Sequence, residues 1–265
     1  MTEQVKERLL YLADKYESAD FLLNDPAKFM HRYSNTKDIE TAAFIAADLA
    51  FGQRKQILSH VEYILSLAGK SPSEWILSAR YADFFGESRA SFYRMYSFFS
   101  MRLFFDALRN LLIQAGSSSL GDYLSEAYQA QREDGFAFPA QFIASFFPDE
   151  CDLIPHSKNA AAKKLNMLLR WMVRTDSPVD LGLWKGFSKS ELLMPLDTHV
   201  MRQATKLKLL LPARSKDGKT KPRSPSLKAA IALTNTMREA FGSDPVRGDF
   251  ALFGLGADES ASAIE

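Results

Sequence analysis

The chain of 265 residues, 46% hydrophobic and 25% charged, is long enough for one large folded domain or for two interlocked lobes. Its one cysteine, Cys151, excludes an internal disulfide and any four-cysteine zinc or iron–sulfur site. No apolar run is long enough for a membrane span or a signal-peptide core, so we expect a cytoplasmic protein with no membrane partner.

The net charge of +1 conceals an uneven distribution along the chain. Residues 1–50 carry six Lys or Arg against nine acidic residues, whereas residues 199–228 carry nine Lys or Arg against Asp217 alone. Clustered basic residues can displace counterions from phosphates, which points weakly to a polyanionic partner. The alternative is a solvated loop with charged flanks.

Apolar residues recur with helical spacing through nearly the whole chain, and no segment alternates with a period of two. The fold class is therefore predicted to be all-α. The predicted helices cover residues 5–16, 39–51, 57–69, 90–116, 119–129, 138–148, 159–174, a segment after Asp197, and 224–242. Residues 211–226, rich in Pro, Gly, Ser and charge, are predicted to form a mobile loop.

Two of these segments carry more specific signals. Ser224 is the candidate N-cap of the last predicted helix, with Pro225 in its first turn and Gly242 just past its end. The aromatic run within residues 92–112 is predicted to be core, and we expect Arg94, Arg102 and Arg109 to lie outside it.

Several chemistries have no sequence signal here. No Glu is followed by His three residues on, no His-Asp dipeptide occurs, and the four histidines are scattered singly. Walker-type and Gly-x-Gly-x-x-Gly phosphate loops are absent as well. We therefore expect no metal and no cofactor.

The stretch "MPLDTHVMRQATKL", residues 194–207, places Asp197 immediately before a predicted helix. Such a carboxylate can cap the helix by accepting hydrogen bonds from backbone N–H groups two or three positions on. Because it lies at the positive end of a helix, it also stays ionised in whatever cleft that end faces. A structural and a catalytic role are both open, and one does not exclude the other.

Four stretches, "FIAADLAFGQRKQI", "KKLNMLLRWMVR", "PLDTHVMR" and "DPVRGDFALFGLG", resemble the helix-hairpin-helix DNA glycosylases. They are most similar to an uncharacterised bacterial family described as resembling archaeal 8-oxoguanine DNA glycosylases. The resemblance implies one domain over residues 1–265 with a cleft between two lobes, residues 41–150 and residues 1–40 plus 151–265. It also implies excision of a flipped, damaged purine base from double-stranded DNA, with or without lyase activity.

By this resemblance, Asp197 is the catalytic carboxylate, and Lys163 or Lys164 is the candidate nucleophile. Adjacent helical residues point about 100° apart, so one lysine is expected in the cleft and the other in solvent. Lys163 is preferred for the cleft, with Lys185 and Lys189 as the next candidates. A lysine can form a Schiff base with the sugar, while the carboxylate stabilises the positive charge that develops on it.

The same resemblance suggests residues that contact nucleic acid. Gln53 is the candidate for insertion into the base stack, with a solvent-exposed helix end as the alternative, and Trp184 is a candidate for stacking on the flipped base unless it is core. The basic candidates for phosphate contact are Arg54, Lys55, Arg170, Arg174, His199 and Arg202.

The chain also departs from the family pattern. Members carry a Leu-Pro-Gly-x-Gly hairpin, whereas the stretch assigned to it here, residues 182–197, has Gly186 as its only hairpin-like glycine, so the hairpin is predicted to be shortened or missing. The iron–sulfur cluster of some relatives is excluded. Two other functions therefore stay open: a non-catalytic nucleic-acid-binding protein of the same fold, and an enzyme acting on free nucleosides.

Overall fold

The computed structural model of the chain describes residues 1–132, 135–211, 213–214, 220–221 and 224–262. Helices dominate, which confirms the all-α prediction, and the described strands form only two small antiparallel pairs. Among these residues, no helix combines the length and the apolar character that a membrane crossing requires.

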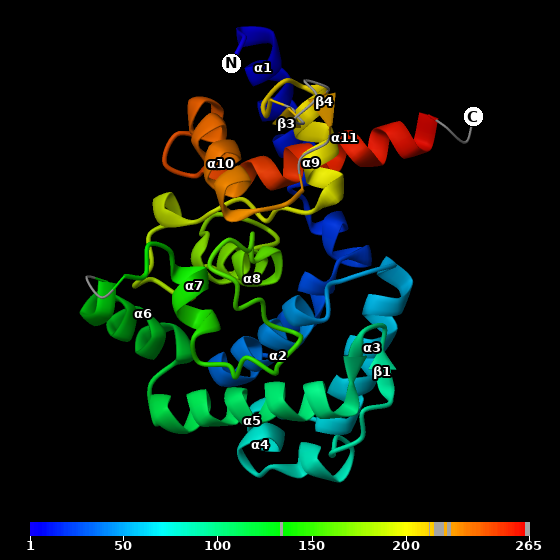
Figure 1. The fold of residues 1–265 in the computed structure, drawn as a ribbon, viewed down its shortest axis with the longest axis vertical. Coiled ribbons are helices and arrows are strands. Elements are labelled where there is room, and N and C mark those ends of the chain that lie inside the picture. The colour runs from blue at the N-terminus through cyan, green and yellow to red at the C-terminus, as the bar shows by residue number, and fades with distance from the viewer. Residues whose placement is uncertain (133–134, 212, 215–219, 222–223, 263–265) are drawn as a thin grey trace.

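The helices fall into three tiers along the long axis of the molecule (Figure 1). One end of the molecule is built from α3 (Arg54–Ala68), α4 (Pro72–Leu77), α5 (Phe98–Ala115) and the strands β1 (Ser91–Tyr93) and β2 (Tyr96–Ser97). The middle holds α2 (Thr36–Asp48), α6 (Leu120–Gln131), α7 (Pro139–Ala144) and α8 (Lys163–Val173). The other end holds α1 (Glu3–Tyr16), α9 (Thr198–Lys206), α10 (Leu227–Phe241), α11 (Gly248–Ser262) and the strands β3 (Ala213–Arg214) and β4 (Thr220–Lys221).

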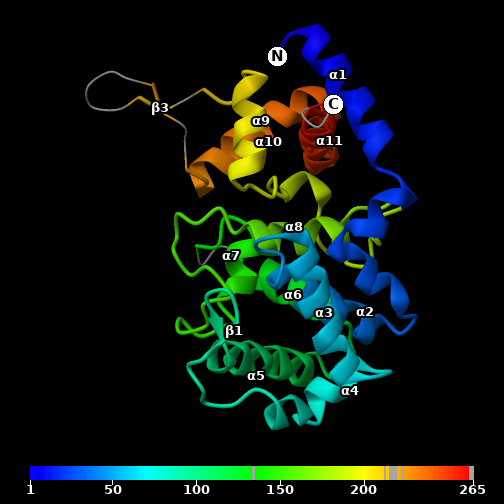
Figure 2. The same cartoon turned by 90° about the vertical axis from the view of Figure 1, so that its right-hand side faces the viewer.

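Short 3₁₀ segments connect these helices: η1 (Ala19–Asn24), η2 (Pro26–Arg32), η3 (Arg80–Asp83), η5 (Lys189–Glu191) and η6 (Pro245–Arg247). Figure 2 shows η1 and η2 as the blue segment that descends from α1 towards α2 along one side of the molecule. This segment brings the N-terminal part of the chain past the junction between the middle tier and the α1–α11 end.

Helix α2 is the hub of the packing. Ten of its thirteen residues are buried, and it packs against α8, η2, α3 and α4. Its apolar residues belong to one continuous hydrophobic core that also contains the buried residues of α5, α8 and α11. A single core of this kind ties the three tiers into one unit.

Local capping explains where most helices begin. Thr2, Asn35, Ser71, Ser97 and Ser119 each accept a hydrogen bond from a backbone N–H in the first turn of the helix that follows. At the other end of α3, α5 and α10, Gly69, Gly116 and Gly242 adopt positive φ, where a side chain would be strained. These signals are legible in the sequence, which is why most of the predicted helices are confirmed.

Two predicted helix boundaries were wrong because a residue adopts positive φ. The helix predicted from residue 90 starts only at Phe98, since Arg94, at φ 55°, turns residues 91–97 into the β1–β2 hairpin. The helix predicted from residue 159 starts at Lys163, because Ala162 is left-handed at φ 45° and ψ 44°. The aromatic run still forms core through Phe104 and Phe105, and Arg94 is exposed.

Two further expectations concern the last part of the chain. The predicted cap of α10, Ser224, was wrong: Ser226 accepts from the Ala229 N–H, and α10 starts at Leu227. Much of the loop predicted over residues 211–226, including residues 212, 215–219 and 222–223, lies outside the described residues, so its predicted mobility stays a prediction.

Candidate functional site

A cavity of about 530 Å³ lies where the middle tier meets the α1–α11 end of the molecule. Its walls come from η1 and η2, the α2–α3 turn, α8, the start of α9, and α11. The charged and polar residues that line it are Asp25, Arg54, Lys163, Arg170, Asp197, His199 and Asp249. Its volume is in the range of small-molecule pockets, roughly 300–1,000 Å³.

Asp197 enters this cavity as the N-cap of α9. Its Oδ1 accepts hydrogen bonds from the backbone N–H groups of His199 and Val200, both at 2.9 Å. Burial opposes ionisation of this carboxyl, but the Lys163 ammonium and the Val200 N–H outweigh burial and lower its pKa. The prediction that Asp197 caps a helix is thus confirmed. Its second oxygen, Oδ2, takes no part in the cap and contacts a different residue.

That partner is Lys163, the first residue of α8. Its Nζ lies 3.2 Å from Asp197 Oδ2 and donates to the Ala50 carbonyl oxygen at 3.4 Å. Both side chains keep about a third of their surface exposed, 31% for Lys163 and 36% for Asp197, so the pair is open to the cavity. Lys163 and Asp197, thirty-four positions apart in the sequence, therefore share one site.

Lys164 points away from the cavity into the core. Its Nζ donates to the carbonyl oxygens of Asp48 and Leu153 and to the Tyr96 hydroxyl, and it lies 3.9 Å from Asp48 Oδ1. Burial raises the pKa of the Asp48 carboxyl, although Lys164 opposes this shift. The prediction that the second lysine faces solvent was wrong, because the groove between α2 and α8 offers buried acceptors at that position.

Two acidic residues of the cavity were missed from the sequence. Asp25 caps η2 by accepting from the Ala27 N–H at 2.9 Å, and Asp249 in the first turn of α11 accepts from Arg170 Nη1. Burial raises the pKa of both carboxyls. The Asp25-Pro26 dipeptide is a recognisable cap signal, but nothing local places either residue beside Lys163.

Aromatic rings form the apolar side of the cavity. Phe21 and Phe253 lie edge to face with ring centroids 4.9 Å apart, and the Arg54 guanidinium lies 5.1 Å from the Phe253 centroid. Flat apolar walls next to cations suit a planar, partly polar ligand.

Within the described residues, no three His, Cys, Asp or Glu side chains are grouped so that they could hold a metal ion. The chemistry visible in this cavity is that of an amine beside carboxylates. An amine whose proton can pass to an adjacent carboxylate can act as a nucleophile, and that carboxylate can also stabilise a developing positive charge.

A comparison with protein families matches residues 25–258 to the family described as "Protein of unknown function (DUF2400)". The chain belongs to this DUF2400 family. No curated protein and no solved structure matches it. The matched range contains every lining residue of the cavity except Phe21, so the Lys163–Asp197 pair lies within the family's shared region.

Several residues predicted to contact nucleic acid line the cavity of this DUF2400 protein or border it. Arg54 and His199 line it. Gln53, Lys55 and Arg202 are exposed and do not line it, and Gln53 is the N-cap of α3 between the lining residues Gly52 and Arg54. Gln53 was expected at the end of a helix, whereas the structure places it at the start of one.

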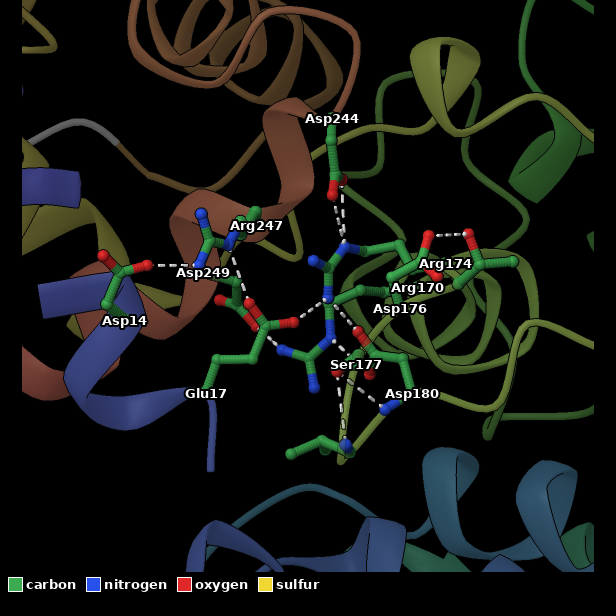
Figure 3. Close-up of polar contacts among 12 residues, drawn as sticks. Asp14, Glu17, Arg170, Arg174, Asp176, Ser177, Asp180, Asp244, Arg247 and Asp249 are labelled. Carbon is green, nitrogen blue, oxygen red and sulfur yellow. Dashed lines mark hydrogen bonds and ion pairs between the residues drawn. The ribbon is translucent and has the colours of Figure 1, made fainter. Parts of the chain in front are cut away.

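Other predicted contacts are corrected because the side chains are buried. Trp184 is 0% exposed, and its Nε1 donates to Glu40 Oε1 at 2.8 Å, so it is a core residue with no face for a base. Arg174 is 2% exposed within the ion pairs of Figure 3 and reaches no phosphate. Arg170 is equally buried, although one edge of it lines the cavity.

The alternative lysines lie elsewhere. Lys185 is exposed outside the cavity, and Lys189 lines a separate pocket beside Arg174. Residues 174–197 contain only the short η5 and no pair of helices, so a missing hairpin at residues 182–197 is confirmed. A turn closed by a hydrogen bond from the Ala160 N–H to the Ser157 carbonyl oxygen lies shortly before the lysine, ahead of α8.

Proposed function

We propose that this DUF2400 protein is a DNA base-excision glycosylase that acts on a flipped, damaged purine and carries lyase activity. The observation that carries the proposal is the contact of 3.2 Å between Lys163 Nζ and Asp197 Oδ2 in an open cavity of about 530 Å³. Both side chains keep about a third of their surface exposed, so the pair is open to a ligand in the cavity. This pair was predicted from the resemblance to helix-hairpin-helix glycosylases, and the short contact between its two side chains supports the proposal.

In the proposed reaction, Lys163 releases its proton to solvent through the open cavity, and the free amine attacks C1′ of the sugar while Asp197 stays ionised. The N-glycosidic bond breaks as the new C–N bond forms, and its electron pair leaves with the base. Asp197 stabilises the positive charge that develops on the sugar during this step. Ring opening gives a Schiff base on Lys163, and loss of the C2′ proton then expels the 3′ phosphate.

The order of elements along the chain supports the same proposal. In the resembled family, a hairpin turn is followed by the lysine, a full helix and the aspartate. Here the turn at residues 157–162, Lys163, α8 and Asp197 follow one another in that order. In this proposal the turn ahead of α8 takes the place of the hairpin that residues 182–197 lack.

The surface around the cavity supports a nucleic-acid substrate in preference to a free nucleoside. Arg54 lines the cavity wall, while Lys55 and Arg202 are exposed next to lining residues of α3 and α9. Exposed cations beside a pocket suit the phosphates that flank a flipped nucleotide.

Borohydride trapping tests the proposal. Wild-type protein is incubated with duplexes that each carry one purine lesion or one abasic site, borohydride is added, and covalent adducts are separated by gel electrophoresis. We expect adducts with wild type and none with Lys163→Ala, because only the Schiff base is reduced to a stable amine. Asp197→Asn should slow adduct formation about 100-fold or more, the usual range for loss of a group that stabilises charge in the transition state.

Lys185→Ala is the matched control, since it removes an exposed lysine that does not line the cavity. It should trap as wild type does. Wild type that binds these duplexes with steep salt dependence but neither traps nor excises would instead identify a non-catalytic binding protein. Absence of DNA binding at low salt, together with cleavage of a free nucleoside, would identify the third function.

A further inference from the structure

The proposed reaction leaves one requirement that the Lys163–Asp197 pair does not meet. When the N-glycosidic bond breaks, its electron pair goes to the base, which must gain a proton to leave as a neutral molecule. Asp197 is unsuited to supply it, because Lys163 and the N–H of Val200 lower its pKa and keep it ionised. A second acid in the same cavity is needed.

Asp249 lines the same cavity as Lys163 and Asp197. It belongs to the first turn of α11, its side chain is 15% exposed, and Arg170 Nη1 donates to its Oδ2. The charged groups that act on it include Arg170 and Lys163 on α8, Asp197 at the start of α9, and Asp25 at the start of η2. Lys163 and Asp197 therefore share the cavity with Asp249 and lie near enough to it to act on its pKa.

Asp249 is also the cavity end of a buried ion-pair network, much of which Figure 3 shows around Arg174. Arg174 pairs with Asp244 at 2.9 Å, with Glu17 at 2.8 Å and with Asp180, while Arg170 pairs with Asp180 at 3.3 Å and with Asp249. Arg247 joins the network through Glu17 at 2.7 Å and Asp14 at 2.5 Å.

The charges of this network do not balance. Its three cations, Arg170, Arg174 and Arg247, face five carboxylates, those of Asp14, Glu17, Asp180, Asp244 and Asp249. Asp14 is exposed, but the side chains of the other four carboxylates are at most 16% exposed, and excess negative charge in such a buried setting favours the uptake of a proton. Of these five carboxylates, Asp249 alone lines the cavity within the part of the chain that the structure describes, so it is the one that can exchange a proton with a ligand there.

The titration of Asp249 agrees with this position. Burial raises its pKa to about 6; Arg170 and Lys163 oppose the rise, while Asp197 and Asp25 add to it. The pKa of Asp197 is thus lowered and the pKa of Asp249 is raised. Carboxyls whose pKa values are shifted in opposite directions are typical of sites where one group stays ionised and another acts as an acid.

We propose that Asp249 is the general acid that protonates the leaving base, an assignment that rests on the glycosylase function proposed above. The C1′–N bond breaks, its electron pair stays on the base, and the carboxyl proton of Asp249 moves to that ring nitrogen. The carboxylate left behind is stabilised by Arg170 and regains a proton from solvent after the base has departed. No oxidant, reductant or metal takes part.

Base release and abasic-site trapping together distinguish an acid role of Asp249 from a purely structural one. Release of a damaged base from duplex DNA needs a proton for the leaving group, whereas reaction of Lys163 with a preformed abasic site has no base to release. We expect Asp249→Asn, which keeps a polar partner for Arg170, to slow single-turnover base release about 100-fold. Borohydride trapping on an abasic duplex should stay within about twofold of wild type, whereas Lys163→Ala abolishes both.

The pH profile gives a second readout. Wild-type base release should fall as pH rises through about 6, because the acid form of Asp249 is lost, and the Asp249→Asn variant should lack this limb. Asp25→Asn, the other cavity carboxyl with a raised pKa, is the matched control and should retain the limb.

Equal loss of base release and abasic trapping in Asp249→Asn would overturn the assignment, since it would show a general disturbance of the site. Unchanged base release, or loss of the limb in Asp25→Asn instead, would overturn it as well. If wild type neither releases bases nor traps on abasic DNA, the glycosylase function itself fails, and that result is distinct from all of these.

Discussion

Asp197 shows how one side chain can both hold a helix and face a reactive partner. Its two oxygens are divided between these tasks: Oδ1 caps α9, and Oδ2 contacts Lys163. Asparagine caps a helix about as well as aspartate, whereas alanine does not. Substitutions at this position can therefore separate the structural contribution from the chemical one.

We expect Asp197→Ala to lower the free energy of unfolding by about 1 kcal/mol, the usual cost of a lost N-cap, and Asp197→Asn to lower it by less than about half that amount. Urea denaturation followed by circular dichroism measures both. Equal stability of the two variants would show that the cap contributes nothing. Both should lose the proposed activity, because neither retains the carboxylate.

Acid should remove the electrostatic contribution of Asp197. Its pKa in the folded protein lies below the ordinary 3.8, so its stabilising effect is present above pH 3.8 and is lost as pH falls through the lowered value. The difference in unfolding free energy between wild type and Asp197→Asn should therefore shrink below about pH 4. A difference that grew in acid would contradict the lowered pKa.

Part of the site could be predicted from individual residues. Asp197 is recognisable in the sequence as a helix N-cap candidate, and Lys163 was predicted from the family resemblance. Asp25 and Asp249 carry no comparable signal, because their meeting with Lys163 depends on how distant segments pack. The burial of Arg174 was not predicted, since one of its acidic partners, Glu17, is far away in the sequence. A core position for Trp184 was one of two alternatives left open, and the structure supports it.

At the scale of elements, the start of α8 is anchored by its two lysines to the end of α2. Lys163 and Lys164 donate to the carbonyl oxygens of Ala50 and Asp48, which lie at the negative end of α2. Since Lys164 is buried beside Asp48, this anchor also fixes the place at which Lys163 enters the cavity.

Lys164→Met should destabilise the protein by about 3 kcal/mol at pH 8, because it leaves a buried carboxylate without its partner. The loss should be smaller at pH 5, since the pKa of Asp48 is already raised and the carboxyl can take up a proton there. Thermal or urea unfolding at the two pH values measures the difference. The double variant Lys164→Met with Asp48→Asn should recover part of the loss, and a loss independent of pH would argue against the buried pair.

Helix α6 docks through a close backbone approach. A Cβ added to Gly121 would lie 2.1 Å from Trp184 Cδ1, and the N–H groups of Leu120 and Gly121 donate to Glu40 at 2.9 Å. We expect Gly121→Ala to cost about 1–3 kcal/mol, the range for overpacking a core. Gly86→Ala, which meets nothing within 4 Å, is the control and should be close to neutral in the same unfolding assay.

Element prediction succeeded where periodicity and caps agreed, as in α1, α3 and α6. It failed at residues 91–97 and 159–162, where Arg94 and Ala162 adopt a left-handed backbone that their residue types do not favour. Such conformations are imposed by tertiary contacts, so propensity and spacing do not reveal them.

At the scale of the whole molecule, the all-α class followed from composition and spacing, whereas the arrangement of the tiers did not. The two predicted lobes, residues 41–150 and residues 1–40 plus 151–265, stay a prediction. The continuous core and the packing of α2 against α8 favour one cooperative unit.

Unfolding should therefore occur in a single transition. Trp75 on α4 and Trp171 and Trp184 in the middle of the molecule are all buried, so tryptophan fluorescence reports on both predicted lobes. We expect its midpoint in urea to coincide with that of circular dichroism. Separate midpoints would show that the lobes unfold independently.

The cavity wall has a consequence for synthesis on the ribosome. Its lining runs from Phe21 to Gly256, and the wall that holds Asp249 and Phe253 belongs to α11, which is synthesised after the other elements that line the cavity. Until that helix has left the exit tunnel, Lys163 and Asp197 have no enclosed pocket around them. A chain that lacks α11 should thus lack the proposed activity, even when the earlier helices have already folded.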